Sequence, residues 1–166
     1  VRTAAGLFDI SHMAEIWVQG GDAAGFLDDA LAGRISSMAV GKAKYSLVLA
    51  EDGGIIDDVI VYRTGEQYFL VVANASNRDA AVDTLAERAD AWPSGSVPRI
   101  EDVTDQTALV AVQGPRAEEI LRAAAGVSVE GLDDLGYYAW RQGEFDGAPL
   151  LVARTGYTGE DGFELM

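Results

Sequence analysis

Alternating apolar and polar positions predict a series of short strands along this chain. In the segment 14–20, Ile16 and Val18 take one side of an extended backbone, and polar or larger side chains take the other. A β-branched run covers 55–62 and is typical of a strand. The remaining strand-like segments are 44–49, 68–73, 99–103, 107–112, 137–142, 149–154 and 162–166.

Three helices are predicted between these strands. Asp22 is a favourable N-cap residue, and the helix that follows it is expected to end at Gly33. Ser76 or Asn77 caps the second helix, whose apolar positions recur at helical spacing. Pro115 suits the first position of the third helix, because a proline there costs no intrahelical hydrogen bond.

The order of these elements predicts the fold class. The strands follow one another in meanders and the helices are inserted singly, which indicates an α+β fold with antiparallel sheets. The strand-strand-helix-strand order in the first part of the chain fits a ferredoxin-like unit. The segment 92–95 contains Pro and Gly and interrupts the pattern.

Composition and charge exclude several classes of function. The chain has 166 residues, of which 49% are apolar, so it can bury a core as one large domain or two small ones. Its net charge of −15 argues against a nucleic-acid binder and against docking on anionic membranes, since both need Lys and Arg. No apolar run approaches the roughly 20 residues of a membrane-spanning helix.

The inventory of reactive side chains is short. Cysteine is absent, which excludes disulfides and thiolate chemistry, and His12 is the only histidine, so no zinc site built on several histidines is expected. No signal peptide is visible, and a cytoplasmic protein is expected. The chain opens at Val1 without a methionine and stops inside a predicted strand at Met166, so we expect a piece of a longer protein.

An acidic pair after a Gly-Gly turn is the first candidate for chemistry. Asp57 and Asp58 follow Gly53-Gly54-Ile55-Ile56, and neighbouring strand residues point to opposite faces, so only one carboxyl can serve a given site. Alternation places Asp58 with Ile56, Ile60 and Tyr62. The alternative interpretation is that one Asp caps the turn and the other is solvated. If Asp58 is the reactive acid, we expect substitution of Asp57 to be far milder.

A glycine-rich segment from Arg154 to Glu164 is the second candidate. Its three glycines allow close backbone approach to a flat ligand, and Tyr157 offers a stacking face. Glu164 could accept hydrogen bonds from the amino groups of a heterocycle. The alternative is a glycine-rich hairpin with a structural tyrosine.

Three further positions leave alternatives open. His12 next to Ser11 suggests nucleophilic catalysis, but adjacent residues rarely face each other, and a structural His12 is equally consistent with the sequence. Met13 leads a strand, where methionine is more often part of a core than a ligand contact. Asn74 ends a predicted strand and is either a turn residue or a bidentate reader of a ligand.

Taken together, these motifs resemble the aminomethyltransferase (T-protein) family of the glycine cleavage system. The similarity covers essentially the whole chain but only about the first half of the family's length. The motifs that carry it, in order, are Phe8-Asp9-Ile10-Ser11-His12-Met13, Lys42 with Tyr45-Ser46, Gly53 to Tyr62, Val71 to Ser76, and Arg154 to Glu164.

The resemblance implies a reaction and a co-substrate. The family transfers the aminomethyl group carried on the dihydrolipoyl arm of the lipoylated H-protein to tetrahydrofolate, giving 5,10-methylenetetrahydrofolate and ammonia. Residues 1–166 would be an incomplete folate-binding aminomethyltransferase domain that includes a ferredoxin-like unit and lacks the family's N-terminal segment and C-terminal barrel domain. The family's arginines for the glutamate tail lie beyond Met166, so the isolated chain is expected to bind folate poorly and to be inactive.

The resemblance also assigns roles to residues. Asp58 matches the essential acid, which positions folate and assists proton movement as ammonia leaves. Lys42 falls where a basic residue contacts the H-protein. The positions that match the lining of the pterin and aminobenzoyl pocket are Met13, Tyr45, Ile60, Asn74, Tyr157 and Glu164.

Three alternatives remain open from the sequence. The nearest is the folate-binding part of a sarcosine- or dimethylglycine-oxidising enzyme on the same scaffold. The second is a folate-binding scaffold without transferase activity, linked to iron–sulfur cluster assembly, although that group does not keep the full acidic-pair and Gly-Tyr-Thr-Gly-Glu-Asp-Gly pattern. The third is a non-enzymatic acidic interaction domain.

Overall fold

The computed structural model describes residues 1–93 and 96–166, which form two compact units. One unit consists of residues 12–106, and the other combines residues 1–11 with residues 107–166. The predicted interruption at 92–95 falls partly outside the described residues, because Ser94 and Gly95 are not among them.

A five-stranded antiparallel sheet forms the larger unit, in the order β3-β4-β5-β2-β6. Apart from β3, the elements follow one another along the chain as β2-α1-β4-β5-α2-β6, which is a β-α-β-β-α-β order. In the sheet these strands lie in the order β6-β2-β5-β4, as in a ferredoxin-like unit, and β3 is added at the edge next to β4. The strands are β2 (Ala14–Gln19), β3 (Ala43–Leu49), β4 (Ile55–Gly65), β5 (Tyr68–Ala73) and β6 (Arg99–Asp102). The α+β prediction and the ferredoxin-like unit are therefore confirmed.

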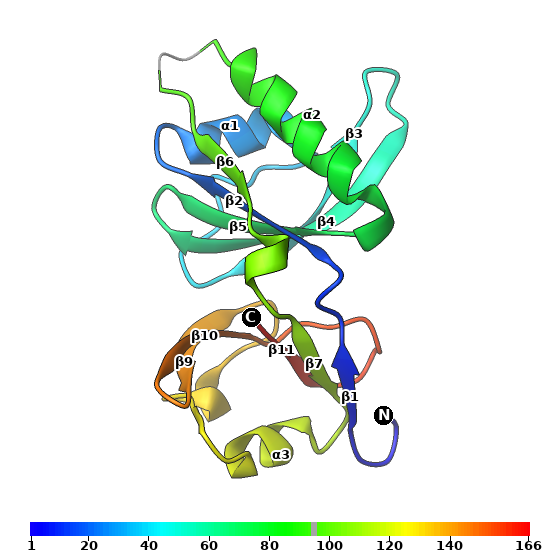
Figure 1. Cartoon of the computed structure of the whole chain (residues 1–166), viewed down its shortest axis with the longest axis vertical. Helices are drawn as coiled ribbons and strands as arrows, with labels where there is room; N and C mark the ends of the chain where they lie inside the picture. Colours follow the sequence, from blue (N-terminus) through cyan, green and yellow to red (C-terminus); the bar gives the residue numbers. More distant parts are fainter. Residues whose placement is uncertain (94–95) are drawn as a thin grey trace. The chain divides into compact units, whose positions relative to one another are not determined.

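Two helices, α1 (Ala23–Ala30) and α2 (Arg78–Asp90), cover one face of this sheet (Figure 1). The side chain of Asp22 accepts a hydrogen bond from the backbone N–H of Gly25, as an N-cap does, but the helix ends earlier than the predicted Gly33. Short 3-10 helices η1 (Ala75–Asn77) and η2 (Thr104–Gln106) precede α2 and follow β6. The core between this sheet face and the two helices is called the helix-side core. It includes Ile16, Val18, Phe26, Leu27, Val59, Val61, Phe69, Val71 and Leu85.

The second unit is built on a six-stranded sheet in the order β1-β7-β11-β10-β9-β8. Its strands are β1 (Gly6–Asp9), β7 (Val110–Gln113), β8 (Val127–Ser128), β9 (Trp140–Phe145), β10 (Ala148–Ala153) and β11 (Gly162–Leu165). Its helices are α3 (Ala117–Ala123) and the 3-10 helix η3 (Leu132–Asp134). Its core includes Val112, Leu121, Leu132, Val152 and Phe163.

The observed elements differ from the predicted ones mainly at their ends and at the two edges of the six-stranded sheet, where neither β1 nor β8 was predicted. The first residue of β1 is half-buried and the other three are exposed, so its residues do not alternate between buried and exposed positions. Strand β7 begins at Val110 rather than 107, and α3 begins two residues after Pro115. In the part of the chain that the structure describes, no helix combines the length and the apolar character needed to cross a membrane.

Candidate functional site

The strand β4 places the two acids on opposite faces of the five-stranded sheet, as alternation predicted. Asp57 lies on the face covered by the helices, like Val59 and Val61, and only 2% of its surface is exposed. Asp58 lies on the opposite face and is half-buried. Neither acid is the solvated or turn-capping residue of the alternative interpretation, because Gly54 N–H is bonded to Asp52 instead.

Asn74 joins the two acids, and this contact was not foreseen from the sequence. Its side-chain Nδ2 donates to Asp57 Oδ1 over 2.8 Å and to Asp58 Oδ1 over 3.0 Å. Its backbone N–H donates to Asp57 Oδ2 over 2.9 Å. Asn74 therefore lies at the candidate site, where its amide hydrogens are engaged by the protein's own carboxylates.

Asp57 contributes more to this arrangement than the sequence suggested. Besides the two bonds from Asn74, it accepts one from Asn77 Nδ2 over 2.7 Å. A buried carboxylate needs such donors, because an unpaired charge removed from water is strongly disfavoured. The expectation that substitution of Asp57 is far milder than that of Asp58 therefore does not follow from their opposite orientation.

Tyr45 and Ile60 share the face of Asp58. They are direct partners across β3 and β4, and Val72 of β5 continues the same row. Desolvation, the negative charge of Asp58 and a hydrogen bond to Asp58 together raise the pKa of the Tyr45 phenol above its ordinary value. A carboxylate bonded to an amide and a phenol on this face is placed to accept a hydrogen bond or a proton from a ligand amine.

Two details of this face differ from the prediction. Ile56 was expected beside Asp58, but the register of β3 and β4 shifts between Val48 and Leu49, and Ile56 packs against the helix-side core. Glu15, which the alternation left on the polar side of β2, is only 1% exposed and pairs with Val72 in the row of Ile60. A polar residue within an apolar strand gives no sequence signal that it is buried.

Met13 belongs to the same unit and lies directly before β2, where it is half-buried. Among the predicted site residues, those in residues 12–106 are Met13, Tyr45, Asp58, Ile60 and Asn74.

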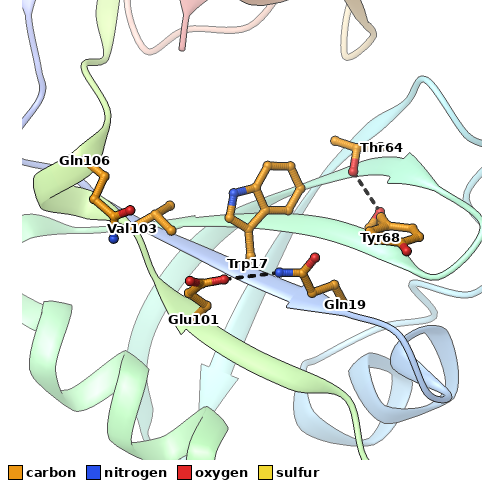
Figure 2. Close-up of a pocket in the computed structure, with 7 residues that line it drawn as sticks. All are labelled: Trp17, Gln19, Thr64, Tyr68, Glu101, Val103 and Gln106. Carbon is orange, nitrogen blue, oxygen red and sulfur yellow. Dashed lines mark hydrogen bonds between the residues drawn. The ribbon is translucent and has the colours of Figure 1, made fainter.

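A cavity of about 490 Å³ opens on the larger unit. Figure 2 shows the Trp17 indole at its centre, with Gln19 and Glu101 joined by a hydrogen bond of 3.3 Å beside it. Trp17 alternates with the core residues Ile16 and Val18, so it stands on the sheet face away from the helices. The other lining residues are Thr64, Tyr68, Val103 and Gln106.

Tyr157 and Glu164 belong to the other unit. Tyr157 lies in the loop before β11 and is 71% exposed, so its ring is open to a stacking partner. Glu164 lies within β11, is 6% exposed, and accepts a short hydrogen bond from the Thr155 hydroxyl. This bond holds the Glu164 carboxylate in a fixed orientation.

Two of the three glycines of the same segment, Gly156 and Gly162, approach a side chain of the protein itself, not a space left for a flat ligand. Gln113 is 2% exposed, and a Cβ added at Gly156 would lie 2.0 Å from its Oε1. A Cβ at Gly162 would lie 2.5 Å from its Cδ. Gln113 Nε2 donates to Thr155 O over 2.9 Å, and its Oε1 accepts from the Thr158 hydroxyl over 3.0 Å. Gln113 thus organises the loop and was missed because a lone glutamine in a strand carries no motif.

Arg154 fixes the beginning of this loop. Its Nε and Nη2 donate to the two carboxylate oxygens of Asp161 over 2.8 Å and 2.6 Å, and Nη2 also contacts Glu118. The hydrogen bond from Arg154 lowers the pKa of Asp161, and the same bond raises the pKa of Arg154. The guanidinium lies over the ring of Phe163.

The remaining candidates have simpler surroundings. The Ser11 hydroxyl donates to Asp9 Oδ1 over 2.7 Å and accepts from Leu109 N–H, which is a structural arrangement. His12 and Lys42 are exposed. Within residues 1–93 and 96–166, no group of three or more His, Asp or Glu side chains is arranged to hold a metal ion.

Comparison with known proteins gives a consistent assignment. Residues 1–166 match the family described as the GCVT N-terminal domain. The chain is 51% identical over 166 residues to an aminomethyltransferase from Streptomyces avermitilis. The aligned region is 100% of this chain but only 43% of that relative. It is 38% identical to the crystal structure of glycine cleavage system aminomethyltransferase T from Bartonella henselae, with a TM-score of 0.85 over 99% of this chain and 42% of that one.

A more distant structure shares the fold alone. The heterotetrameric sarcosine oxidase from Corynebacterium sp. U-96 is 16% identical, with a TM-score of 0.68 over 98% of this chain and 75% of that chain. The family match over the whole chain and the high identity to named aminomethyltransferases are decisive here. The chain therefore belongs to the GCVT N-terminal domain family.

Proposed function

We propose that this chain is part of an aminomethyltransferase that moves the aminomethyl group of an S-aminomethyldihydrolipoyl carrier protein to tetrahydrofolate. The observation that carries the proposal is the Asp58 carboxylate, bonded to Asn74 and Tyr45 on the sheet face away from the helices. Identity of 51% to an aminomethyltransferase, against 16% to a sarcosine oxidase, supports this activity over the sarcosine-oxidising alternative.

The proposed reaction exchanges two bonds of one carbon. The methylene carbon leaves sulfur and nitrogen and forms bonds to N5 and N10 of tetrahydrofolate. One N–H proton of folate passes to the departing thiolate, giving the thiol, and the other passes to the departing amino group, giving ammonia. A carboxylate near N5 and N10 stabilises the positive charge of an iminium-like species. Asp58 fits this role because its contacts with Asn74 and Tyr45 fix its position.

Several of the predicted residues are proposed to bind tetrahydrofolate. A pterin needs apolar and aromatic walls with a few fixed polar groups. Ile60 and Tyr45 offer such walls beside Asp58. Glu164, oriented by Thr155, is proposed to hold the amino edge of the pterin. The remaining proposed folate-binding residues are Met13, Asn74 and Tyr157.

A basic segment supports a contact with the carrier. Residues 30–50 contain no acidic side chain and hold Arg34, Lys42 and Lys44, although the whole chain has a net charge of −15. We infer that the exposed Lys42 contributes to binding the lipoylated H-protein. The chain is proposed to act in the cytoplasm, as an incomplete folate-binding domain of the transferase.

The test is Asp58→Asn in the full-length protein, assayed with lipoylated carrier and tetrahydrofolate. Loss of a general acid–base group lowers turnover by about 10²- to 10⁴-fold, so we expect transfer to be nearly abolished. Tetrahydrofolate binding, measured by equilibrium titration, is expected to persist in part. Asp83→Asn, an exposed position on α2, removes the same charge and is the control. Near-normal turnover of Asp58→Asn would refute the assignment.

A further inference from the structure

The contacts of Asp57 define a polar cluster consisting of Asp57, Asp58, Asn74 and Asn77. Asp57 Oδ1 accepts hydrogen bonds from Asn74 Nδ2 and Asn77 Nδ2, and its Oδ2 accepts from Asn74 N–H. Asp57 is 2% exposed, so water cannot replace these donors readily. Asn77 is the N-cap residue of α2, yet its amide bonds to Asp57 rather than to the first turn of the helix.

The orientation of the Asn74 side-chain amide follows from this cluster. Its Nδ2 lies 2.8 Å from Asp57 Oδ1, 3.0 Å from Asp58 Oδ1 and 3.1 Å from Asp58 O. All three neighbours are acceptors, so only the NH₂ group can face them, and the amide carbonyl must point away. Two hydrogens serve three acceptors, which means that the bonds to the two acids are coupled through one nitrogen.

We propose that Asp57 and Asn77 are positioning residues for Asp58. The buried Asp57 carboxylate accepts a hydrogen bond from Asn74 Nδ2 and so keeps this NH₂ group turned toward the two acids. The same NH₂ group then donates to Asp58 and fixes the Asp58 side chain. Asn77 Nδ2 donates to the same Asp57 oxygen as Asn74 Nδ2 and so helps to hold this carboxylate in place. The inference deepens the proposed transferase function and rests on it.

The variant Asp57→Asn discriminates between positioning and mere packing. An asparagine at this position can still accept from Asn74 N–H through its Oδ1. Its NH₂ group then needs acceptors, which Asn74 and Asn77 supply by turning their amides over. The fold is preserved in this way, but the Asn74 carbonyl now faces the Asp58 carboxylate, and the two repel each other.

The experiment uses the full-length transferase with Asp57→Asn and Asn77→Ala, and with Asp83→Asn as the charge-matched control on the exposed side of α2. Misplacement of a reacting group by about 1 Å costs up to about 10²-fold in rate. We expect kcat of Asp57→Asn to fall by at least about tenfold on that basis, with the Kd for tetrahydrofolate changed by less than about threefold. Asn77→Ala removes one donor and is expected to give a smaller fall in kcat, and the control none.

A spectroscopic readout is independent of activity. Asn74 and Asn77 are the two asparagines of this chain, so selective ¹⁵N-asparagine labelling reports few side-chain NH₂ signals from it. Asn77→Ala removes the Asn77 pair and Asn74→Asp removes the Asn74 pair, which assigns both, and the asparagine introduced by Asp57→Asn adds one further pair. In Asp57→Asn the Asn74 pair is expected to shift strongly, because it loses its carboxylate acceptors.

The outcomes separate the two proposals. If the wild-type protein neither binds tetrahydrofolate nor accepts the aminomethyl group, the proposed function fails, whatever the NMR spectra show. If the wild type is active, but both variants keep kcat within about twofold, or the Asn74 signals stay unchanged in Asp57→Asn, the positioning inference is wrong. If Asp57→Asn does not fold, Asn77→Ala alone decides, since it leaves the carboxylate and two of its donors in place.

Discussion

The substitution Gly156→Ala tests how the loop that carries Tyr157 is built. A Cβ at this position would lie 2.0 Å from Gln113 Oε1 and 2.4 Å from its Cδ and Nε2. Gln113 is 2% exposed, so it has no room to move aside without giving up its hydrogen bonds to Thr155 and Thr158.

The magnitude follows from these two effects. Overpacking a filled interior costs about 1–3 kcal/mol, and a buried polar group left unsatisfied costs about 1–3 kcal/mol, so we expect a loss of roughly 2–6 kcal/mol in the free energy of local opening. Gly159→Ala is the matched control. Its φ of +70° lies, like the φ of +155° at Gly156, in the region that favours glycine, but no heavy atom lies within 4 Å of the added Cβ. The control should therefore cost only roughly 1–2 kcal/mol.

Native-state hydrogen exchange of the backbone amides in β7 and β11 measures this loss in the full-length protein. Because about 1.4 kcal/mol corresponds to a factor of ten, exchange in Gly156→Ala should accelerate by at least about thirtyfold. Adding Gln113→Ala makes room for the new methyl group, so the double variant should be less destabilised than the sum of the single ones by at least about 1 kcal/mol. Equal losses for Gly156→Ala and Gly159→Ala, or strict additivity in the double variant, would show that Gln113 does not set the glycine requirement.

Two predictions concern ionisation. The Tyr45 phenol should titrate above its ordinary pKa of about 10, and Asp58→Asn should bring that pKa down, because it removes the negative charge and the hydrogen-bond acceptor beside the hydroxyl. The difference in tyrosine absorbance between each protein and its Tyr45→Phe counterpart measures this shift, and an unchanged titration in Asp58→Asn contradicts the contact. The pKa of Asp161 is lowered by Arg154, so its contribution to stability is present above its unfolded pKa of about 4 and is lost as the pH falls through the lower folded value. Asp161→Asn should flatten the dependence of the urea midpoint on pH in that acidic range, and an unaltered slope there speaks against the ion pair.

Much of the fold could be predicted locally. Period-two alternation located β2 nearly to the residue, the strand-like segment 149–154 matched β10 to within one residue, and the Asp22 cap located the start of α1. The edge strand β1 escaped prediction because three of its four residues are exposed, so pairing with β7 and not burial defines it. The end of α1 escaped as well, since residues beyond Leu31 stay close to the core without continuing the helix.

For the candidate site, the sequence determined that Asp57 and Asp58 point to opposite faces of one strand, because side chains alternate along any extended backbone. It also identified the family, because the motifs occur in a fixed order along the chain. Only the tertiary structure decided what each acid contacts. Asn74 and Asn77 lie 17 and 20 residues from Asp57, and they reach it through the register of β4 with β5 and the start of α2. Gln113 meets Gly156 through the pairing of β7 with β11. Register depends on how whole strands pair, so no single stretch of residues encodes these contacts.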